Sequence, residues 1–410
     1  MADFNTIDDF DVNGKTVLLR IDINSPVDPN SGIILDDTRM KLHSETIKEL
    51  SLKGAKVVII AHQSRPGKND FTKLDQHAVE LSRCVGLEVK YVDSLFSSRA
   101  KEAILALEPG QILLLENARF FSEETLKRSA EEQATSVLVR ELSPVADYFV
   151  NDAFAAAHRS QASLVGFTRT LPSAAGRVME NELTTISSAL DNVQHPCVFA
   201  LGGMKADDSI MVMENVLANG TADYVLVSGL IANIVIWAAG YDIKSTNNNF
   251  IIDRGYKDMV DKCRELLQRF GDKIVYPRDV AVGVLNDRAD VTIENIPDAP
   301  IFDIGRESLI EYSRLLREAK TILANGPAGV FENPIFSIGT QDIINAMAFS
   351  EGFTIVGGGH IAAACVSMGY GEKMDHISSG GGASINMLAG KPLAAVEALK
   401  ASKELFADKE

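Results

Sequence analysis

Short runs of apolar residues recur along the chain, and longer segments with a helical spacing of apolar residues separate them. The runs are rich in β-branched residues and end at polar residues or glycine, which is typical of strands covered on both faces in a parallel sheet. Alternation of such strands with helices predicts the α/β class. The expected strands are Val17–Ile21, Val57–Ala61, Ile112–Leu115, Tyr148–Val150, Val198–Leu201, Tyr224–Val227, Ile274–Tyr276, Thr321–Ala324 and Thr354–Val356. Expected helices include Glu123–Glu141, Tyr256–Phe270 and Ser308–Ala319.

The length of 410 residues suits two or three domains, at roughly 100–200 residues per domain, and we expect two. The stretch Ala175–Leu183 resembles a glycine break followed by a helix, so we expect the boundary within residues 176–190. We place the first domain at residues 1–176 and the second at residues 177–390.

Composition and charge narrow the possible functions. Hydrophobic residues make up 46% and charged residues 23% of the chain, as in ordinary globular proteins, and the net charge is −16. Because phosphate backbones and anionic lipids bind to basic surfaces, we expect no nucleic-acid or membrane partner. The acidic N-terminus does not resemble a signal peptide, and no apolar stretch approaches the ~18 residues of a membrane span. Four scattered cysteines suggest neither a disulfide framework nor a zinc site, so we expect a cytoplasmic protein.

In the first half of the chain, arginine and histidine residues lie at or after the ends of the expected strands. Because the carboxyl ends of parallel strands meet at one edge of a sheet, several guanidinium groups would point into one crevice. Guanidinium groups bind carboxylates and phosphates through paired hydrogen bonds. A single arginine is more often a surface ion-pair partner, but the shared position favours a site for a small substrate with several negative charges. These residues are Arg20, Arg39, His62, Arg65, Arg119, His158 and Arg159.

In the second half, the expected strands end in glycine-rich turns that precede helices. Glycine lets backbone N–H groups approach a phosphate, and the N-terminus of the next helix favours negative charge. One such turn would be weak evidence, since tight turns also use glycine, but four of them favour a nucleotide site. The turns are Leu201–Lys205, Asn325–Glu332, Val356–His360 and Ser378–Ser384. The chain has no Walker loop, no protein-kinase catalytic loop and no dinucleotide fingerprint.

Several motifs, in this order and spacing, resemble the phosphoglycerate kinase family over about residues 16–395. They are Arg20-x-Asp22-x-Asn24-x-Pro26, Asp36-Asp37-Thr38-Arg39, His62-x-x-Arg65-Pro66, Leu115-Glu116-Asn117-x-Arg119-Phe120, Asn151-Asp152-Ala153-Phe154 with His158-Arg159, Leu201-Gly202-Gly203-x-Lys205, Asn325-Gly326-Pro327 with Gly329-Val330-Phe331-Glu332, and Gly380-Gly381-Gly382-Ala383-Ser384.

The resemblance implies two Rossmann-like domains with doubly wound parallel sheets that face a cleft and are joined by a hinge, with residues 391–410 or so packing back on the first domain. The expected hinges are Gly176–Glu180 and the turn after Gly390. By resemblance, the first domain binds 3-phosphoglycerate through Asp22, Asn24, Arg39, His62, Arg65, Arg119 and Arg159. The second domain binds ATP or ADP through Gly203, Lys205, Asn325, Pro327, Glu332, Gly357, Gly358, Gly359, His360 and Ile361.

The implied reaction is reversible phosphoryl transfer between 1,3-bisphosphoglycerate and ADP, with Mg²⁺ as cofactor. The resemblance implies that the partners are small-molecule substrates and that the protein is a monomer or homodimer. The attacking group is a carboxylate that is already ionised at pH 7, so direct in-line transfer needs no general base. Positioning and charge neutralisation remain as the tasks of the enzyme. The expected catalytic residues are Arg39, Lys205, Gly358 and Gly381, the last within the helix N-terminus Gly380–Gly382. The 3-phosphate is assigned to His62, Arg65, Arg119 and Arg159, and the ribose to Glu332.

Three positions depart from the commonest family pattern. Ser209 stands where a second lysine is usual, His360 where an acidic residue is usual, and Ser379 where threonine is usual. Because the acidic residue is a usual Mg²⁺ contact in the family, the protein ligand of the metal stays open. Asp208 lies nearby, and Mg²⁺ often binds mainly to phosphates and water. The departures resemble the archaeal branch of the family.

Two other functions are possible from the residues. A Rossmann-type oxidoreductase would need a dinucleotide fingerprint, which the chain lacks. A non-catalytic nucleotide-binding protein could use the same fold, and the changes at Ser209 and His360 are its only support.

Overall fold

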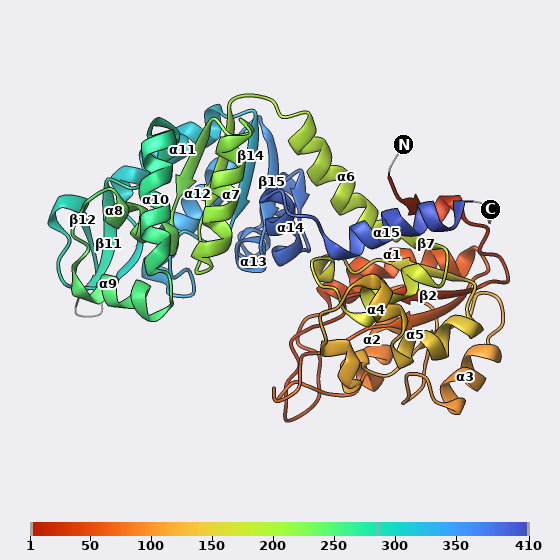
Figure 1. The fold of residues 1–410 in the computed structure, drawn as a ribbon. Coiled ribbons are helices and arrows are strands. Elements are labelled where there is room, and N and C mark those ends of the chain that lie inside the picture. The colour runs from red at the N-terminus through yellow and green to blue at the C-terminus, as the bar shows by residue number, and fades with distance from the viewer. Residues whose placement is uncertain (1–2, 285–286, 408–410) are drawn as a thin grey trace. The chain divides into compact units, whose positions relative to one another are not determined.

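A computed structural model describes residues 3–284 and 287–407. The chain divides into two compact units, unit 1 (Met1–Thr184 with Pro392–Glu410) and unit 2 (Thr185–Lys391). The division falls inside helix α6 (Arg177–Asp191), which begins directly after Gly176. Each unit contains a parallel sheet with helices on both faces (Figure 1), so the predicted α/β class is confirmed.

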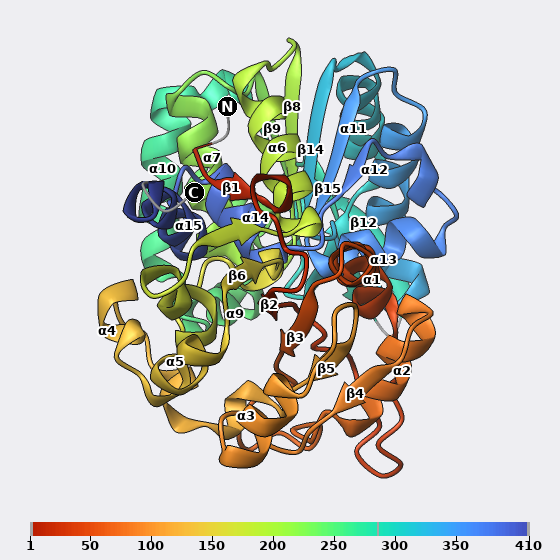
Figure 2. The same ribbon diagram turned by 90° about the vertical axis from the view of Figure 1, so that its right-hand side faces the viewer.

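Unit 1 contains a seven-stranded sheet in the order β1-β7-β6-β2-β3-β5-β4, and its paired strands are all parallel (Figure 2). Successive side chains of β2 enter different cores, with Val17 and Leu19 on one face and Leu18 on the other. Burial on both faces explains why these strands have unbroken apolar sequences. The strands are β1 (Asn5–Thr6), β2 (Thr16–Arg20), β3 (Lys56–Ile60), β4 (Val89–Tyr91), β5 (Ile112–Leu114), β6 (Tyr148–Asn151) and β7 (Ser173–Ala175).

The helices of unit 1 include one from the C-terminal end of the chain. Helix α15 packs against β7, and the Ala395 N–H donates to the carbonyl of Ala157 at 2.9 Å. The helices are α1 (Thr38–Leu52), α2 (Asp75–Val85), α3 (Ser98–Leu105), α4 (Ala130–Ala134), α5 (Val137–Leu142) and α15 (Ala394–Leu405).

The prediction of one helix over Glu123–Glu141 is wrong. The segment forms a 3₁₀ turn over Ser122–Thr125 and then the short helices α4 and α5. Ser129 and Glu132 form a capping box that starts α4 afresh. The buried Glu124 carboxylate accepts hydrogen bonds from Ser163, which fixes the turn before α4. A long-range contact and a local cap therefore override the helical pattern.

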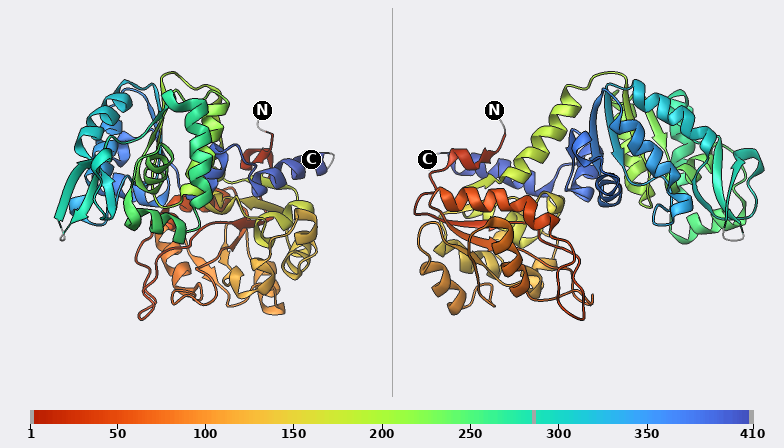
Figure 3. Two further views of the ribbon diagram at one scale, coloured as in Figure 1. Left: turned by 60° about the vertical axis from the view of Figure 1, so that its left-hand side comes forward. Right: turned by 180° about the vertical axis from the view of Figure 1, so that it is seen from behind.

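Unit 2 contains a six-stranded parallel sheet in the order β10-β9-β8-β14-β15-β16. A separate antiparallel sheet, β12-β11-β13, lies beside it (Figure 3), and the sequence did not lead us to expect it. The strands are β8 (Cys197–Leu201), β9 (Tyr224–Val227), β10 (Ile274–Val275), β11 (Asp279–Val284), β12 (Asp287–Thr292), β13 (Ile301–Ile304), β14 (Thr321–Asn325), β15 (Phe353–Gly357) and β16 (His376–Ile377). The helices are α7 (Ala206–Ala218), α8 (Gly229–Ala238), α9 (Lys244–Asp253), α10 (Lys257–Phe270), α11 (Arg306–Glu318), α12 (Ile338–Ala348), α13 (Gly359–Ser367) and α14 (Gly381–Leu388). No helix in the described residues is long and apolar enough to span a membrane.

Strand order locates the expected ligand position in each unit. In unit 1 the chain runs outward from β2 through β3 and then returns to the other side of β2 with β6. In unit 2 it runs outward from β8 through β9 and returns to the other side of β8 with β14. Ligands of doubly wound sheets bind beyond the carboxyl ends of the strands at such switch points. The residues after β2, β8 and β14 are therefore the first to consider.

Candidate active site

The loop after β2 places Asp22 against Arg39 at the start of α1. The Arg39 guanidinium donates to one Asp22 oxygen, and the Asn24 N–H donates to the other at 3.1 Å. Burial alone would raise the pKa of Asp22, but Arg39, the Asn24 N–H and Arg20 together hold it well below its usual range. Asp22 is therefore ionised and holds Arg39, whose side chain is 40% exposed and so available to a ligand.

His62, directly after β3, is a buried neutral imidazole. The Arg20 Nη2 lies 2.9 Å from its Nδ1, and because arginine only donates, Nδ1 must accept and Nε2 must carry the proton. Burial and then the nearby Arg20 charge lower the pKa of His62 far below its usual value. Arg20 itself is fully buried and donates from Nε to Ser163 Oγ at 2.8 Å. Our expectation that Arg20 points into the ligand crevice is therefore wrong, and it orients His62 instead.

Arg119 and Arg159 add positive charge near the same loops. Burial, Arg159 and Arg20 together lower the pKa of Arg119 to about 10. Such mutual repulsion is unfavourable until an anion binds between the cations. Arg119 also donates to the carbonyl of Ser64, which fixes the direction of its side chain. The group formed by Arg39, His62, Arg119 and Arg159 is called the guanidinium cluster below.

The two other expected substrate residues are Asn24 in the loop after β2 and Arg65 in the loop after β3. Asn24 Oδ1 accepts from the Ser64 N–H at 2.7 Å, so this atom holds the loop in place. Ser64 adopts a φ of 55°, and its hydroxyl donates to Asp70 at 2.5 Å. Arg65 follows on the exposed side of the loop. The side-chain amide oxygen of Asn24 therefore fixes the position of the loop after β3, while Arg65 extends toward solvent.

Unit 2 contains a cavity of about 600 Å³ beyond the ends of β8, β14 and β15. This volume falls within the range of small-molecule sites. Two expected nucleotide residues do not line it. Gly357 is the last residue of β15, and the Ile361 side chain is buried in the apolar core. The expected residues that do line the cavity are Gly203, Lys205, Asn325, Pro327, Glu332, Gly358, Gly359, His360 and Gly381.

Glycines allow the turns after β8 and β14 to pass in close contact. A Cβ on Gly202 would lie 2.4 Å from the Pro327 carbonyl oxygen. Gly326 has a φ of 80°, and a Cβ there would lie 2.5 Å from the Gly202 carbonyl oxygen. The Gly203 N–H donates to the Pro327 carbonyl at 2.7 Å, which fixes the two turns together. Side chains at these positions would push the walls of the cavity apart.

One end of the cavity gathers groups suited to phosphate. Lys205 is exposed at the start of α7, and no ion pair of its ammonium with another described residue is seen. Helices α13 and α14 begin at the cavity with Gly359 and Gly381, so their N-terminal N–H groups and dipoles favour an anion there. The buried Asn325 Oδ1 has no hydrogen-bond partner among the described residues.

The other end of the cavity is apolar, and sequence reasoning missed it. It is lined by α9 through Phe250 and by β13 through Ile301 and Phe302. Apolar residues on a strand of an unexpected sheet give no signal of ligand binding in the sequence. An apolar end joined to a phosphate-binding end is the arrangement that a nucleotide requires.

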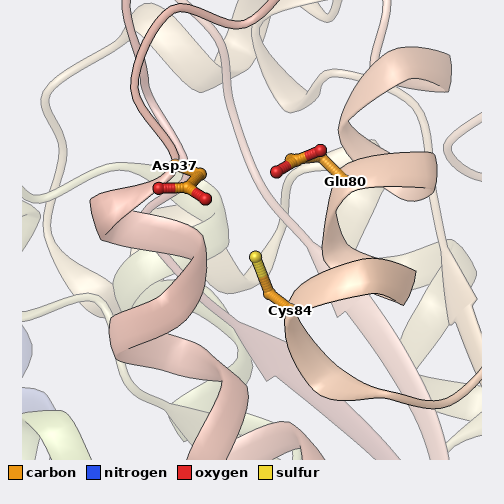
Figure 4. Close-up of side chains that lie close together, drawn as sticks. All are labelled: Asp37, Glu80 and Cys84. Atoms are coloured by element: carbon orange, nitrogen blue, oxygen red, sulfur yellow. The ribbon is translucent and has the colours of Figure 1, made fainter.

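Three side chains of unit 1 come close enough to share a metal ion, namely Asp37, Glu80 and Cys84 (Figure 4), and they are the one such group among the described residues. Arg83 donates to both carboxylates, and the Lys41 ammonium lies 2.8 Å from Asp37. Burial raises the pKa of the Cys84 thiol. Mg²⁺ prefers oxygen ligands, and these carboxylates are already neutralised, so the group is not a magnesium site.

A nucleotide-sized cavity in one unit and a guanidinium cluster in the other are typical of a phosphotransferase with a small anionic second substrate. The family model for phosphoglycerate kinase matches residues 7–391. The chain is 60% identical to the phosphoglycerate kinase of Methanothermobacter thermautotrophicus, covering 98% of this chain and 97% of that protein. It is 58% identical to that of Methanobacterium bryantii, covering 97% of each.

A solved structure agrees with these sequence relatives. The crystal structure of phosphoglycerate kinase from Pyrococcus horikoshii OT3 superposes with a TM-score of 0.91 at 40% identity, covering 98% of this chain and 99% of that one. The chain therefore belongs to the phosphoglycerate kinase family and is a kinase. The resemblance that its motifs predicted, including that to the archaeal members, is confirmed.

Proposed function

We propose that the protein catalyses reversible phosphoryl transfer between 1,3-bisphosphoglycerate and ADP, giving 3-phosphoglycerate and ATP in glycolysis and gluconeogenesis. The observation that carries this proposal is the guanidinium cluster, in which burial and the neighbouring Arg159 charge lower the pKa of Arg119. Such a cluster is matched to a substrate with both a phosphate and a carboxylate. Membership in the family and the cavity in unit 2 support the nucleotide half of the reaction.

On the substrate side, Arg39 is the residue that we assign to the reacting carboxylate and to the moving phosphoryl group. Its pairing with ionised Asp22 leaves part of the guanidinium exposed for that contact. Arg119, Arg159 and the Nε2–H of neutral His62 are assigned to the 3-phosphate. A neutral donor among the cations orients the phosphate without adding further repulsion.

On the nucleotide side, Lys205 and the N-terminus of α14 at Gly381 are assigned to the phosphoryl group and the β-phosphate. Gly358 and Gly359 supply backbone N–H groups at the start of α13, and Glu332 is assigned to the ribose. These donors are fixed before the reaction begins, and fixed donors stabilise charge that develops in the transition state. No base is required, because the attacking carboxylate carries its charge at neutral pH.

Mg²⁺ is the cofactor that we propose, carried by the nucleotide phosphates. Asp208 on α7 does not itself line the cavity, but it lies within electrostatic reach of Lys205, and we assign it to the water shell of the ion. Burial and the neighbouring Asp207 raise the pKa of Asp208, whereas Lys205 and Lys391 lower it, and a cation would relieve the unfavourable part of that environment. One carboxylate with phosphates and water fits the usual coordination of Mg²⁺. The bound ion would supply neutralisation of phosphoryl charge.

The proposed partners are thus small molecules, and we propose a cytoplasmic location for this step of central metabolism. Binding measurements with separated ligands test the assignment of the two sites. Arg119→Ala should weaken 3-phosphoglycerate binding and leave ADP binding unchanged, and Lys205→Ala should do the reverse. Arg264→Ala and Lys257→Ala on α10 are matched controls, because both side chains are exposed and lie outside the proposed sites. Loss of both ligands in either site variant, or of neither, would contradict the assignment.

A further inference from the structure

The guanidinium of Arg20 lies in the core of unit 1, where neighbouring groups accept from each of its three nitrogens. Nη2 lies 2.9 Å from His62 Nδ1, Nε donates to Ser163 Oγ at 2.8 Å, and Nη1 donates to the Ile21 carbonyl. Arg20 is fully buried, and His62 is 2% exposed. Because a guanidinium is a rigid planar group, these three acceptors together fix its orientation.

Ser163 connects Arg20 to a buried carboxylate. Because arginine only donates, Ser163 Oγ accepts from Arg20, and its single hydrogen is left for Glu124 Oε1, which lies 2.6 Å away. The Ser163 N–H donates to the other carboxylate oxygen at 2.9 Å. Burial raises the pKa of Glu124, while the Arg20 charge and the two Ser163 donors act against that rise. A buried guanidinium requires a negative charge nearby, and Glu124 provides it through the serine hydroxyl.

The same sequence of donors and acceptors determines which nitrogen of His62 carries the proton. Nδ1 accepts from Arg20, so the proton is on Nε2. The charges of Arg119 and Arg159 contribute to the lowered pKa of His62, which places the ring near both of these guanidinium groups. The hydrogen bond made by one ring nitrogen sets the protonation of the other. If Arg20 turned away, the proton would be free to move to Nδ1, and Nε2 would then repel an anion instead of donating to it.

We propose that Ser163 and Glu124 are positioning residues for the 3-phosphate of the substrate. They hold Arg20 in the orientation that makes His62 Nε2 a hydrogen-bond donor. Both side chains are fully buried, so they act through Arg20 and not by contact with a ligand. The inference rests on the proposed function, because it takes the His62 Nε2–H as a contact of 3-phosphoglycerate.

Ser163→Ala isolates this role, because it removes only the hydroxyl. The backbone N–H at this position still donates to Glu124, and no charge changes. Calorimetry with 3-phosphoglycerate should show binding weakened on the order of 10-fold, the lower end of the range for one hydrogen bond to a charged group. In a His62→Gln background the same substitution should have little further effect, because the chain of hydrogen bonds ends at His62. Ser136→Ala is the matched control and should bind as the wild type does, since that buried hydroxyl has no hydrogen-bond partner among the described residues.

Two further measurements separate positioning from a merely structural or electrostatic role. In ¹⁵N NMR spectra of the histidine rings, His62 of the wild-type protein should have a protonated Nε2 and an unprotonated Nδ1, and Ser163→Ala should show a population protonated on Nδ1. Glu124→Gln should weaken 3-phosphoglycerate binding. The Glu124 charge counteracts the fall in the pKa of Arg119, so it lies near the cations, and its removal by charge alone would strengthen the binding of an anion.

The possible failures are distinguishable. Unchanged affinity in Ser163→Ala, or an equal loss with and without His62, would overturn the inference and leave the proposed function intact. Tighter binding in Glu124→Gln would overturn it too, since that result indicates an effect of charge alone. Absence of 3-phosphoglycerate binding by the wild-type protein would contradict the proposed function itself. If Ser163→Ala does not fold, the wild-type spectrum decides, because a proton on Nδ1 of His62 would overturn the inference and a proton on Nε2 would support it.

Discussion

His77 should make the stability of unit 1 strongly sensitive to acid. It lies on α2 and is 1% exposed, and its Nε2 is 3.1 Å from the Gln63 amide oxygen. The Ser25 N–H donates to that same oxygen, and the Gln63 amide nitrogen donates to the Ser25 carbonyl, so the amide orientation is fixed. His77 Nε2 must therefore carry the proton, while the buried Nδ1 has no hydrogen-bond partner among the described residues. A second proton would place an unpaired charge in the core.

The magnitude follows from proton linkage. Burial lowers the pKa of His77 from 6.5 to about 4. Above pH 6.5 the side chain is neutral in both the folded and the unfolded chain, so it has no effect on the pH dependence. Below pH 6.5 the unfolded chain binds a proton that the folded chain does not, and the free energy of unfolding falls by about 1.4 kcal/mol per pH unit. Over the whole interval down to the folded pKa the loss amounts to about 3 kcal/mol.

The variant His77→Gln isolates this contribution, because glutamine can still donate to Gln63 and carries no charge at any pH. The measurement is urea unfolding at several pH values between 7 and 4.5, with hydrogen exchange of the β3 amides as the probe of unit 1. As the pH falls, the free energy of unfolding should decrease less steeply in the variant than in the wild type, by about 1.4 kcal/mol per pH unit. His360→Gln is the control, since an exposed imidazole keeps its hydration in both states. Parallel slopes for wild type and His77→Gln would refute the reasoning.

Two further predictions concern the nucleotide site in unit 2, and a third concerns a buried hydrogen bond in unit 1. Gly202→Ala should weaken ADP binding tenfold or more in calorimetry without affecting 3-phosphoglycerate, because the new Cβ would displace the Pro327 carbonyl; unchanged ADP affinity would refute the close-packed turns. Chelation by EDTA should abolish turnover, and Asp208→Asn should raise the Mg²⁺ concentration needed for half-maximal activity; an unchanged requirement would exclude Asp208 as a contact of the ion's water shell. His43→Leu should lower the free energy of urea unfolding by about 1–3 kcal/mol, because the Asp152 carboxylate loses its buried hydrogen-bond partner at 2.8 Å. His43→Gln should recover part of that loss. Equal losses in both variants would count against the hydrogen bond as the cause.

The parallel sheets could be predicted because their strands are buried on both faces. Every residue of β8 is buried, so its sequence is an uninterrupted apolar run. The antiparallel sheet could not be predicted in the same way. Strand β12 is largely exposed and polar, and only its pairing with β11 makes it a strand. The pattern of apolar residues in the sequence therefore identifies strands that are buried along their whole length. It misses strands that are exposed and form only by pairing with another strand.

The site could be predicted to the extent that its chemistry is carried by unusual residue types at strand ends. Arg119 and Lys205 are identifiable in this way because several arginines lie at strand ends and several glycine-rich turns precede helices, whereas one of either alone would be weak evidence. Arg20 could not be assigned in this way. Its position at a strand end does not indicate that its guanidinium is buried and donates to the Ser163 hydroxyl.

The most direct test of the account is ADP formation from ATP and Mg²⁺, measured with and without 3-phosphoglycerate. The account predicts ADP formation that depends on 3-phosphoglycerate, is lost with EDTA, and falls by a factor of about 10²–10⁴ in both Arg39→Ala and Lys205→Ala. A folded wild-type protein that binds ATP and 3-phosphoglycerate and forms no ADP would contradict phosphoryl transfer and make the chain a nucleotide-binding protein without this activity.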